Sequence, residues 1–593
     1  MKTKFLFSLG LLLAVMLEVW SQDALRPVPK KVNARDARIT NIGVVASDIM
    51  VWKTEDAQTQ QSDTTVTSES YILWQSDGDL EEQAARHRAE AADIERQHRA
   101  KAMARNGARR VSAVSQEGRL QEWLAYFYYY VFTYEYPSVD ADGKEVMLSA
   151  IAACPPKDAD EVRDVVIGTH ITITADKQRP SAQTNNYKAD DWGVLMSMAA
   201  GKKLKLGWRA NLTFGFLLPF WPFWAGIGIA AEAKSGEDAY NNNLVILADY
   251  EGYGVTKSRA HPYLYQELTA RQVVDATRYG IALYKSDASL SSIRHSIRDD
   301  FRTVSCGYSQ GGSVALATHR FIEQNGLADE LHFVGSLCGD GPYDPMATLM
   351  YYMKNDLAGK SMSMPVVLPL IVKGMLDSNP YMIDHRAEEY FNKKFLHTGI
   401  MDWLASKEYT TGDIEDMFEK CYREGWGSDK TYFQDLFTLD SRKVPHLMMN
   451  KIMNEECYAY FRKVYEDNQS TFTEKDGIPL PARRGVMEDL HLALASNDMT
   501  KGWTPEHTVM LFHSDHDTVV PYENAQSAQN SFGGWVVLNT STNGHDHVDS
   551  GMDFFKGEMS DVLKNFAIRI YMAKKKLCDQ AWKNQQKGCI TSW

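Results

Sequence analysis

One short motif constrains this chain more than any other feature. Residues 307–311 read Gly-Tyr-Ser-Gln-Gly and match Gly-x-Ser-x-Gly, the pattern in which a serine lies on a sharp turn between a strand and a helix. The β-prone residues 303–306 precede the motif, and the helix-favouring residues 312–318 follow it. The glycines permit the tight turn and allow the helix to pack closely on the strand. The sequence therefore predicts a nucleophilic Ser309 on a strand–turn–helix unit.

Length and composition set broad bounds. The chain has 593 residues, which is enough for a large core and for two or more domains. Its 44% hydrophobic and 24% charged residues are typical of a globular protein. The net charge of -13 argues against a general nucleic-acid binder, which needs a basic face. We therefore expect no nucleic-acid partner.

The N-terminus has the order of an export signal. Lys2 and Lys4 give a positive start, and residues 5–16 form an apolar stretch that is too short to span a membrane. A small residue, Ser21, then suits a cleavage site. We expect residues 1–21 to be a signal peptide and the protein to be exported, whether secreted, periplasmic or at the cell surface. A buried N-terminal helix is the alternative.

The cysteine count is odd, so at least one thiol is unpaired within the chain. Two of the cysteines, Cys306 and Cys338, fall in expected core strands and are expected to be buried thiols. Two pairings are open from the sequence, Cys578 with Cys589 and Cys421 with Cys457. No Cys-x-x-Cys pair supports a zinc ribbon or a thioredoxin-like site. The seven cysteines are Cys154, Cys306, Cys338, Cys421, Cys457, Cys578 and Cys589.

Residues 22–116 form a polar N-terminal segment. Within it, residues 23–79 are mostly polar and are expected to be irregular. Residues 80–105 are charged and rich in alanine, which predicts one helix. Because this helix lacks a continuous apolar stripe, we expect a solvated surface helix or a mobile arm. A partner-binding coiled coil is the alternative.

From residue 117 to residue 593 the pattern is that of an α/β domain. Residues 127–136 and 145–153 predict a β-hairpin around a turn at residues 140–143. Six further apolar runs follow, separated by helical stretches. This order suggests a mixed, mostly parallel central sheet with helices on both faces. The six runs are residues 165–173, 244–250, 303–307, 332–337, 508–513 and 534–538.

Two insertions interrupt the alternation. The first, near residues 204–236, contains an aromatic-rich apolar stretch from Leu212 to Ala231, in which prolines and glycines argue against a regular helix. It is either a flap that touches a membrane surface or covers the substrate, or plain core packing. The second, near residues 346–501, is rich in helical patterns and is expected to form a helical cap.

A serine nucleophile needs a base and a carboxylate that orients the base. Asp517 lies in a polar loop just after the strand at residues 508–513, and Asp515 is its competitor. His547 lies in another polar loop before a helical segment, and His545 is the alternative. The chain order serine, acid, histidine is the order found with this kind of serine turn.

The same two loops allow a metal interpretation, because they carry six ligand-like side chains. A hydrolytic zinc site would, however, leave the Gly-x-Ser-x-Gly motif unexplained. We therefore expect neither a metal nor another cofactor. The six residues are His513, Asp515, His516, Asp517, His545 and His547.

An acyl-transfer site also needs two backbone N–H donors for the developing oxyanion. The amide after the nucleophile, that of Gln310, is the first candidate. The second donor should come from the loop after the strand that begins at residue 165. That loop lacks the common His-Gly-Gly pattern, so the residues alone do not name the donor.

Six further segments form a recognisable set: Asp-Tyr-Glu-Gly-Tyr-Gly at residues 249–254, His-Pro-Tyr-Leu at 261–264, the serine motif at 307–312, Asp-Gly-Pro-Tyr-Asp at 340–344, Gly-Trp-Thr-Pro at 502–505 and Asp-Thr-Val-Val-Pro-Tyr at 517–522. Together they resemble the α/β-hydrolase superfamily and, more narrowly, exported esterases and lipases of the secretory-lipase type. The resemblance covers roughly residues 127–573 and implies an α/β-hydrolase fold with a helical cap. It also implies Ser309, Asp517 and His547 as the catalytic triad. Family members carry His-Gly-Thr or an acidic residue after the first core strand, where this chain has His-Ile-Thr, and the resemblance assigns the second oxyanion donor to Thr172.

These expectations describe an exported serine hydrolase that cleaves carboxylic esters through an acyl-enzyme. Its substrate would be a small-molecule or lipid ester, with contact to a membrane surface through Leu212 to Ala231 as a further expectation. One alternative is a serine peptidase of the prolyl-oligopeptidase kind, although the segment before Trp123 is too short and polar for the usual β-propeller. Another is a non-catalytic binding protein on a hydrolase scaffold. The sequence leaves the oligomeric state open.

Overall fold

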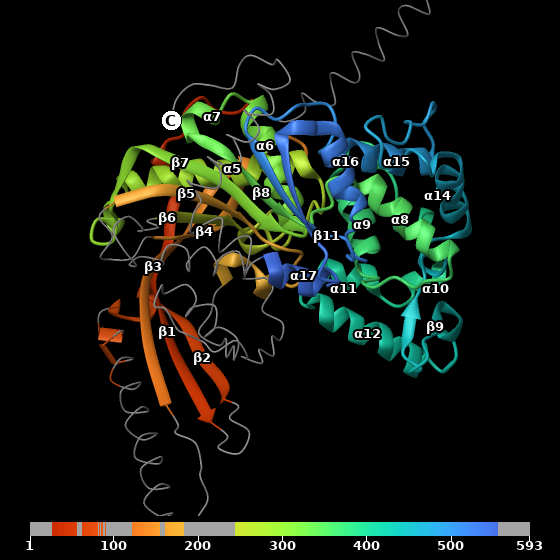
Figure 1. Ribbon diagram of the computed structural model, residues 1–593, viewed down its shortest axis with the longest axis horizontal. Coiled ribbons are helices and arrows are strands. Elements are labelled where there is room, and N and C mark those ends of the chain that lie inside the picture. Colours follow the sequence, from red (N-terminus) through yellow and green to blue (C-terminus); the bar gives the residue numbers. More distant parts are fainter. Residues whose placement is uncertain are drawn as a thin grey trace, which may run out of the picture.

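The centre of the protein is a ten-stranded sheet with the order β12-β11-β8-β7-β5-β6-β4-β3-β1-β2 (Figure 1). The computed structural model describes residues 27–55, 62–80, 121–154, 161–182 and 243–554, together with residues 82, 83, 85, 86 and 89. The strands of the sheet are β1 (Arg38–Glu55), β2 (Ser62–Trp74), β3 (Gln121–Val139), β4 (Glu145–Ala153), β5 (Glu161–Thr169), β6 (Asn243–Ala248), β7 (Ser296–Tyr308), β8 (Phe333–Gly339), β11 (Thr508–Ser514) and β12 (Val536–Ser541).

The sheet changes from antiparallel to parallel along its width. β3 pairs with β4 in antiparallel fashion, as the hairpin pattern predicts, and β4 also pairs antiparallel with β6. From β6 onward every neighbouring pair is parallel, through β5, β7, β8 and β11 to β12. An antiparallel start followed by parallel strands with helical connections is the α/β-hydrolase fold, so the predicted fold class is confirmed. The carboxyl ends of the parallel strands lie at one edge, where such sheets hold their sites.

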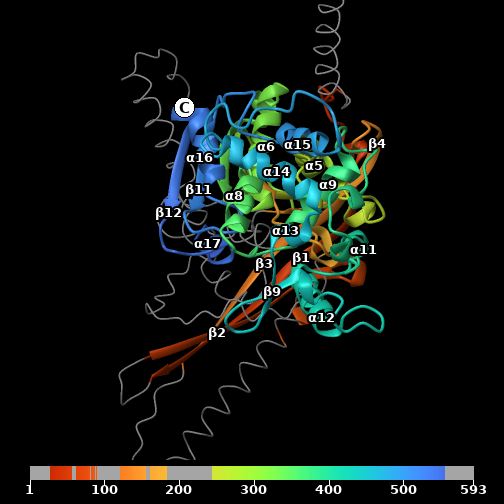
Figure 2. The ribbon, with the colours of Figure 1, turned by 90° about the vertical axis from the view of Figure 1, so that its right-hand side faces the viewer.

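The N-terminal segment differs from the expectation. Residues 38–55 and 62–74, expected to be irregular, form β1 and β2, and β1 pairs antiparallel with both β2 and β3. Figure 2 shows β1 and β2 extending away from the body of the protein. The prediction was wrong because it gave more weight to the polar composition of these residues than to their β-propensity. β2 contains three threonines, whose branched side chains favour strands, and the pairing of β1 with the distant strand β3 stabilises the arrangement.

Two long helices pack on the sheet and form the main core with it. α5 (Gln266–Ser286) buries most of its residues, and α6 (Gln310–Gln324) begins directly after Ser309. The two helices lie side by side and contact β3, β6, β7 and β8. Fully buried Phe132, Tyr134 and Ile167 are part of this core.

The segment between β8 and β11 is the helical insertion, and it gathers at one side of the sheet (Figure 1). It has an apolar core of its own, which also takes in Tyr263, Leu264, Val519 and Val520 from the loops at the edge of the sheet. The insertion and the sheet therefore meet at these loops. Its helices are α8 (Pro345–Leu357), α9 (Val367–Ser378), α10 (Lys393–Leu396), α11 (Ile400–Ser406), α12 (Thr411–Glu424), α13 (Met449–Ile452), α14 (Glu455–Asn468) and α15 (Val486–Ser496), with a small hairpin of β9 (Phe437–Leu439) and β10 (Pro445–Leu447).

Cys421 of α12 and Cys457 of α14 are both free thiols, so the bridge considered between these helices is not formed. Cys306 and Cys338 are buried free thiols, as expected. Cys578 and Cys589 lie outside the described residues.

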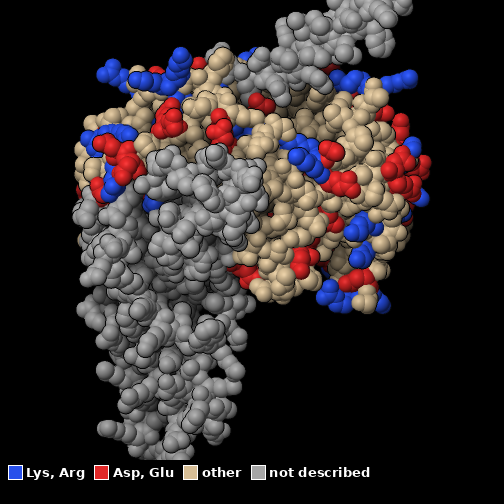
Figure 3. All heavy atoms as spheres, turned by 45° about the horizontal axis from the view of Figure 1, so that its top comes forward, with Lys and Arg blue, Asp and Glu red and all other residues tan. Residues whose placement is uncertain are grey.

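Three further expectations fall outside the described residues: the signal peptide at residues 1–21, the apolar insertion with Leu212 to Ala231, and most of the charged helix at residues 80–105. None of the helices in the described ranges combines the length and the apolar character needed to cross a bilayer. On the face drawn in Figure 3, basic and acidic side chains of the described residues alternate among neutral ones.

Candidate active site

Ser309 lies on a strained turn between β7 and α6. Its backbone has φ 58° and ψ -127°, a conformation that is costly for a residue with a side chain and is typical of functional sites. Its N–H donates to the carbonyl of Gly339 on the neighbouring strand at 2.9 Å. A Cβ at Gly307 or Gly311 would overlap atoms of Thr169 on β5, so both glycines are needed for the close approach of strand and helix.

The structure brings the three expected side chains together. His547 Nε2 lies 2.8 Å from Ser309 Oγ, and His547 Nδ1 lies 2.5 Å from Oδ2 of Asp517. The Asp517 side chain is fully buried, and that of His547 is 8% exposed. A hydrogen-bonded path therefore runs from a buried carboxylate through an imidazole to a serine hydroxyl, which is the arrangement that activates a serine.

Backbone groups fix the carboxylate and the imidazole in place. Oδ1 of Asp517 accepts hydrogen bonds from the N–H groups of Val519 and Val520, both at 2.8 Å, which leaves Oδ2 for the imidazole. His547 is the first residue of α17 (His547–Asp553). Asp546 caps this helix and also accepts a hydrogen bond from the N–H of Thr518 at 3.0 Å. The loop that carries Asp517 and the helix that begins at His547 are therefore joined.

The competing residues face elsewhere. Asp515 pairs with the exposed His516, at 2.5 Å between Oδ1 and Nδ1. His545 Nδ1 lies 2.6 Å from Oδ2 of Asp553. Of the four candidates for acid and base, Asp517 and His547 are the two that reach the serine.

Asp517 and His547 each shift the pKa of the other. Burial alone would raise the pKa of Asp517, but the charge and the hydrogen bond of His547 lower it below its usual value. Burial alone would lower the pKa of His547, whereas the carboxylate of Asp517 raises it above 6.5. The pair therefore favours an ionised carboxylate, which stabilises positive charge on the imidazole.

A second carboxylate, that of Asp340, lies beside this pair and was missed as a site residue. It follows directly after β8, has a positive φ of 35° and is fully buried. One carboxylate oxygen lies within 4.8 Å of ligand atoms of both Asp517 and His547. Burial raises the pKa of Asp340 to about 6, and the charge of Asp517 adds to the effect while His513 opposes it. The signal that could have found it is its place directly after an apolar strand, the same position that pointed to Asp517.

Of the two oxyanion candidates, Gln310 follows Ser309 directly and Thr172 lines the same cavity as Ser309. Gln310 is the first residue of α6, a position whose N–H has no acceptor within the helix. Its side-chain Nε2 lies 3.3 Å from Nε2 of His261, and this hydrogen bond holds the Gln310 side chain in place. Thr172 lies along the same cavity as Ser309, and its Oγ1 is 2.8 Å from the hydroxyl of Tyr263.

A cavity of about 580 Å³ opens at Ser309, between the edge of the sheet and the helical insertion. This size is in the range of small-molecule sites. Its walls are mostly apolar, with a polar end at the start of α12. The apolar walls include Leu264, Tyr352, Met364, Val367, Ile371, Val519 and Val520, and the polar end includes Lys177, Thr410, Thr411 and Asp413.

Only part of the metal interpretation can be built from these residues. Of its six residues, Asp517 and His547 converge, joined by Asp340. His513 Nε2 is 2.8 Å from the carbonyl of Val520, and the other three residues are engaged in the pairs described above. Among the described residues a second cluster, His319 with Glu323 and His507, lies elsewhere, and there the carboxylate also accepts from the N–H groups of residues 506 and 507.

Comparison with protein-family models gives no match for this chain, and comparison with curated proteins gives none either. Among solved structures, it is similar to a rice cell wall degrading esterase LipA from Xanthomonas oryzae, at 17% identity and a TM-score of 0.48, over 76% of this chain and 91% of that one. It is also similar to Candida antarctica lipase A in its closed state, at 13% identity and a TM-score of 0.43, over 73% of this chain and 78% of that one. Such identities and TM-scores support no conclusion about function, which has to come from the site itself.

Proposed function

We propose that this protein is a serine hydrolase that cleaves carboxylic ester bonds through an acyl-enzyme, with Ser309, Asp517 and His547 as its triad. The observation that carries the proposal is the unbroken path of hydrogen bonds from Asp517 through His547 to Ser309, on the wall of a mostly apolar cavity. A non-catalytic scaffold has no need for a strained serine turn whose hydroxyl meets a buried imidazole.

The proposed reaction has two halves. His547 Nε2 accepts the proton of the Ser309 hydroxyl while Oγ attacks the ester carbonyl, and Asp517 stabilises the imidazolium that forms. The N–H groups of Gln310 and Thr172 hold the oxyanion. His547 then donates its proton to the leaving alcohol, and a water molecule releases the acyl group by the same steps in reverse.

The apolar cavity favours an ester of a carboxylic acid with an apolar acyl chain over a polar peptide substrate. Burial of each CH₂ group contributes about 0.8 kcal/mol, so a chain of several carbons gains substantial binding energy along these walls. Thr410 and Thr411, which line the cavity at the start of α12, carry hydroxyl groups that suit the alcohol part of the substrate.

The proposal includes export, which rests on the order of residues 1–21 alone. It also includes contact of Leu212 to Ala231 with a lipid surface, which rests on their aromatic and apolar composition.

Activity assays on purified protein test the proposal. We expect turnover of p-nitrophenyl acyl esters and little turnover of aminoacyl-proline amides, with the ester activity lost in Ser309→Ala. Ser441→Ala, in an exposed turn of the insertion, is the matched control and should keep full activity. Dominant amide turnover would favour a peptidase, and ester turnover that survives in Ser309→Ala would remove the proposed nucleophile.

A further inference from the structure

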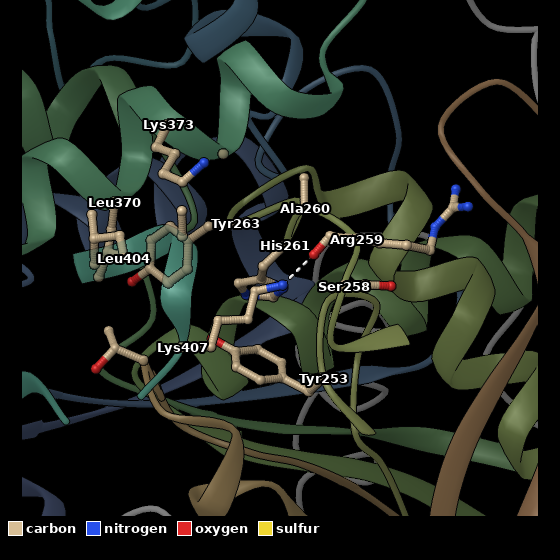
Figure 4. A pocket seen from close by; sticks show the side chains of 13 residues that line it. Tyr253, Ser258, Arg259, Ala260, His261, Tyr263, Leu370, Lys373, Leu404 and Lys407 are labelled. Atoms are coloured by element: carbon tan, nitrogen blue, oxygen red, sulfur yellow. Dashed lines mark hydrogen bonds between the residues drawn. The ribbon is translucent and has the colours of Figure 1, made fainter. Parts of the chain in front are cut away.

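A second, smaller pocket, of about 180 Å³, adjoins the cavity at Ser309, and Figure 4 shows the side chains that line it. Its volume is several times the ~30 Å³ that a water molecule occupies in the liquid. Tyr263 belongs to the walls of both cavities. In Figure 4, Lys373 and Lys407 reach this pocket from the helical insertion, and Tyr253, Arg259 and His261 come from the loop after β6.

Lys407 is the unusual member of this pocket. It follows α11 directly, has a positive φ of 55° and is only 4% exposed, although lysine is among the residues least often buried. Its Nζ donates to the carbonyl of Lys257 at 2.9 Å and to that of Arg259. It also lies 5.8 Å from the centre of the Tyr253 ring. Backbone dipoles and an aromatic face therefore hold the ammonium group in place.

These partners solvate the charge of Lys407 but do not neutralise it. In the described part of the chain, no carboxylate forms an ion pair with this lysine within 4.0 Å. The other cations of the pocket do have such partners. Lys373 pairs with Asp377 at 2.5 Å, and Arg259 pairs with Asp140 and Glu251 at 2.6 Å each.

A buried charge without a counter-charge is costly, and an anion placed beside it would remove most of that cost. The pocket offers such a ligand a second ammonium group, that of Lys373, which also pairs with Asp377. We propose that this pocket binds a small free oxyanion, such as sulfate, phosphate or acetate, with the Lys407 ammonium as its main partner. The site is separate from the serine and needs no catalysis for its test.

The charge state of the lysine supports a pH-sensitive site. Burial, and after it the charge of Lys373, lower the pKa of Lys407 to about 8, although the charges of Asp176, Asp377 and Glu251 oppose this shift. Because the anion needs the protonated lysine, its affinity should fall as the pH rises through about 8. An exposed lysine would keep its charge to about pH 10.

Titration calorimetry with sodium sulfate on the full chain at low ionic strength tests the proposal, because sulfate keeps its charge across the range. We expect one saturable site, with at least tenfold weaker affinity in Lys407→Met and a fall of similar size in the wild type between pH 7 and pH 9.5. Acetate and phosphate should compete with sulfate for the same site. Lys443→Met is the matched control, since Lys443 also has a positive φ, of 64°, but is exposed. The affinity of this variant for sulfate should equal that of the wild type.

The measurement of sulfate affinity against pH uses the wild type alone, so it tests the proposal even if Lys407→Met folds poorly. Lack of saturable sulfate binding by the folded wild type would overturn the proposal. So would an affinity that stays constant up to pH 9.5, or one that Lys443→Met weakens as much as Lys407→Met does.

Discussion

The hydroxyl group of Tyr308 lies 2.7 Å from Oδ2 of Asp340, and this contact joins the end of β7, next to Ser309, to the residue that follows β8. The same hydroxyl lies 2.6 Å from the carbonyl of His547. Ser550, one turn along α17 from His547, donates to the same carboxylate oxygen at 2.7 Å. Asp340 therefore holds the start of α17 against β7, and with it the imidazole against Ser309.

Removal of the Tyr308 hydroxyl should loosen this arrangement. We expect Tyr308→Phe to lower kcat about tenfold with little change in KM, because small misplacements of a catalytic group are costly to the chemical step. Steady-state kinetics on a p-nitrophenyl ester measures the effect.

Tyr458→Phe is the matched control for that variant, since it removes a similar hydrogen bond, 2.6 Å from Tyr458 to Asp356, within the insertion. Its kcat should stay at the wild-type value. Equal losses in the two variants would show that Tyr308 acts through general stability and not on the base.

The strand–turn–helix unit depends on close contact at Gly311. A Cβ there would overlap the carbonyl oxygens of Thr169 and His170. We expect Gly311→Ala to lower the free energy of unfolding by about 3 kcal/mol, as overpacking of a tight core does, and to abolish activity. Gly534→Ala is the control, because a Cβ at Gly534 meets no atom within 4 Å. Chemical denaturation of both variants measures the difference, and a stable, active Gly311→Ala would contradict the account of the turn.

The pH dependence of activity should report His547. Its imidazole must be neutral to accept the serine proton, so kcat/KM should rise with pH, with a midpoint above 6.5 because Asp517 raises the pKa of His547.

Asp517→Asn should lower kcat by about 10⁴-fold, since the imidazolium then lacks its carboxylate. The midpoint of the remaining activity should move to lower pH. Asp515→Asn, in the same loop, should change neither kcat nor the pH midpoint. If Asp515→Asn lost activity and Asp517→Asn kept it, Asp515 and not Asp517 would be the carboxylate that orients His547.

The walls of the cavity should set the length of acyl chain that the protein accepts. Ile371 on α9 lines the cavity and is 5% exposed. Ile371→Trp adds bulk there, so we expect long-chain p-nitrophenyl esters to lose kcat/KM by about tenfold more than the acetate ester does. Leu376→Trp makes a similar change on the same helix outside the cavity walls. A parallel loss for all chain lengths in Ile371→Trp would argue that the acyl chain binds elsewhere.

Local patterns were enough to predict the turn at Ser309 and the strands on either side, because glycine spacing and apolar runs are properties of neighbouring residues. The positions of Asp517 and His547 at strand ends pointed to the right edge of the sheet, but their choice over Asp515 and His545 depends on side-chain directions that only the folded loops define. β1 and β2 were missed because their residues are mostly polar and because the pairing of β1 with β3 is long-range. Asp340 was missed because its partners, Tyr308, Ser514 and Ser550, come from three separate elements.

The central claim, that Ser309 is a nucleophile activated by His547, has a direct test. Purified protein is treated with a fluorophosphonate, and the labelled peptide is identified by mass spectrometry in the wild type, Ser309→Ala and His547→Ala. We predict stoichiometric modification of Ser309 in the wild type, none in Ser309→Ala and a rate at least 10³-fold lower in His547→Ala, because the serine then lacks its base. Label on a different residue, or equally fast labelling without His547, would contradict the account.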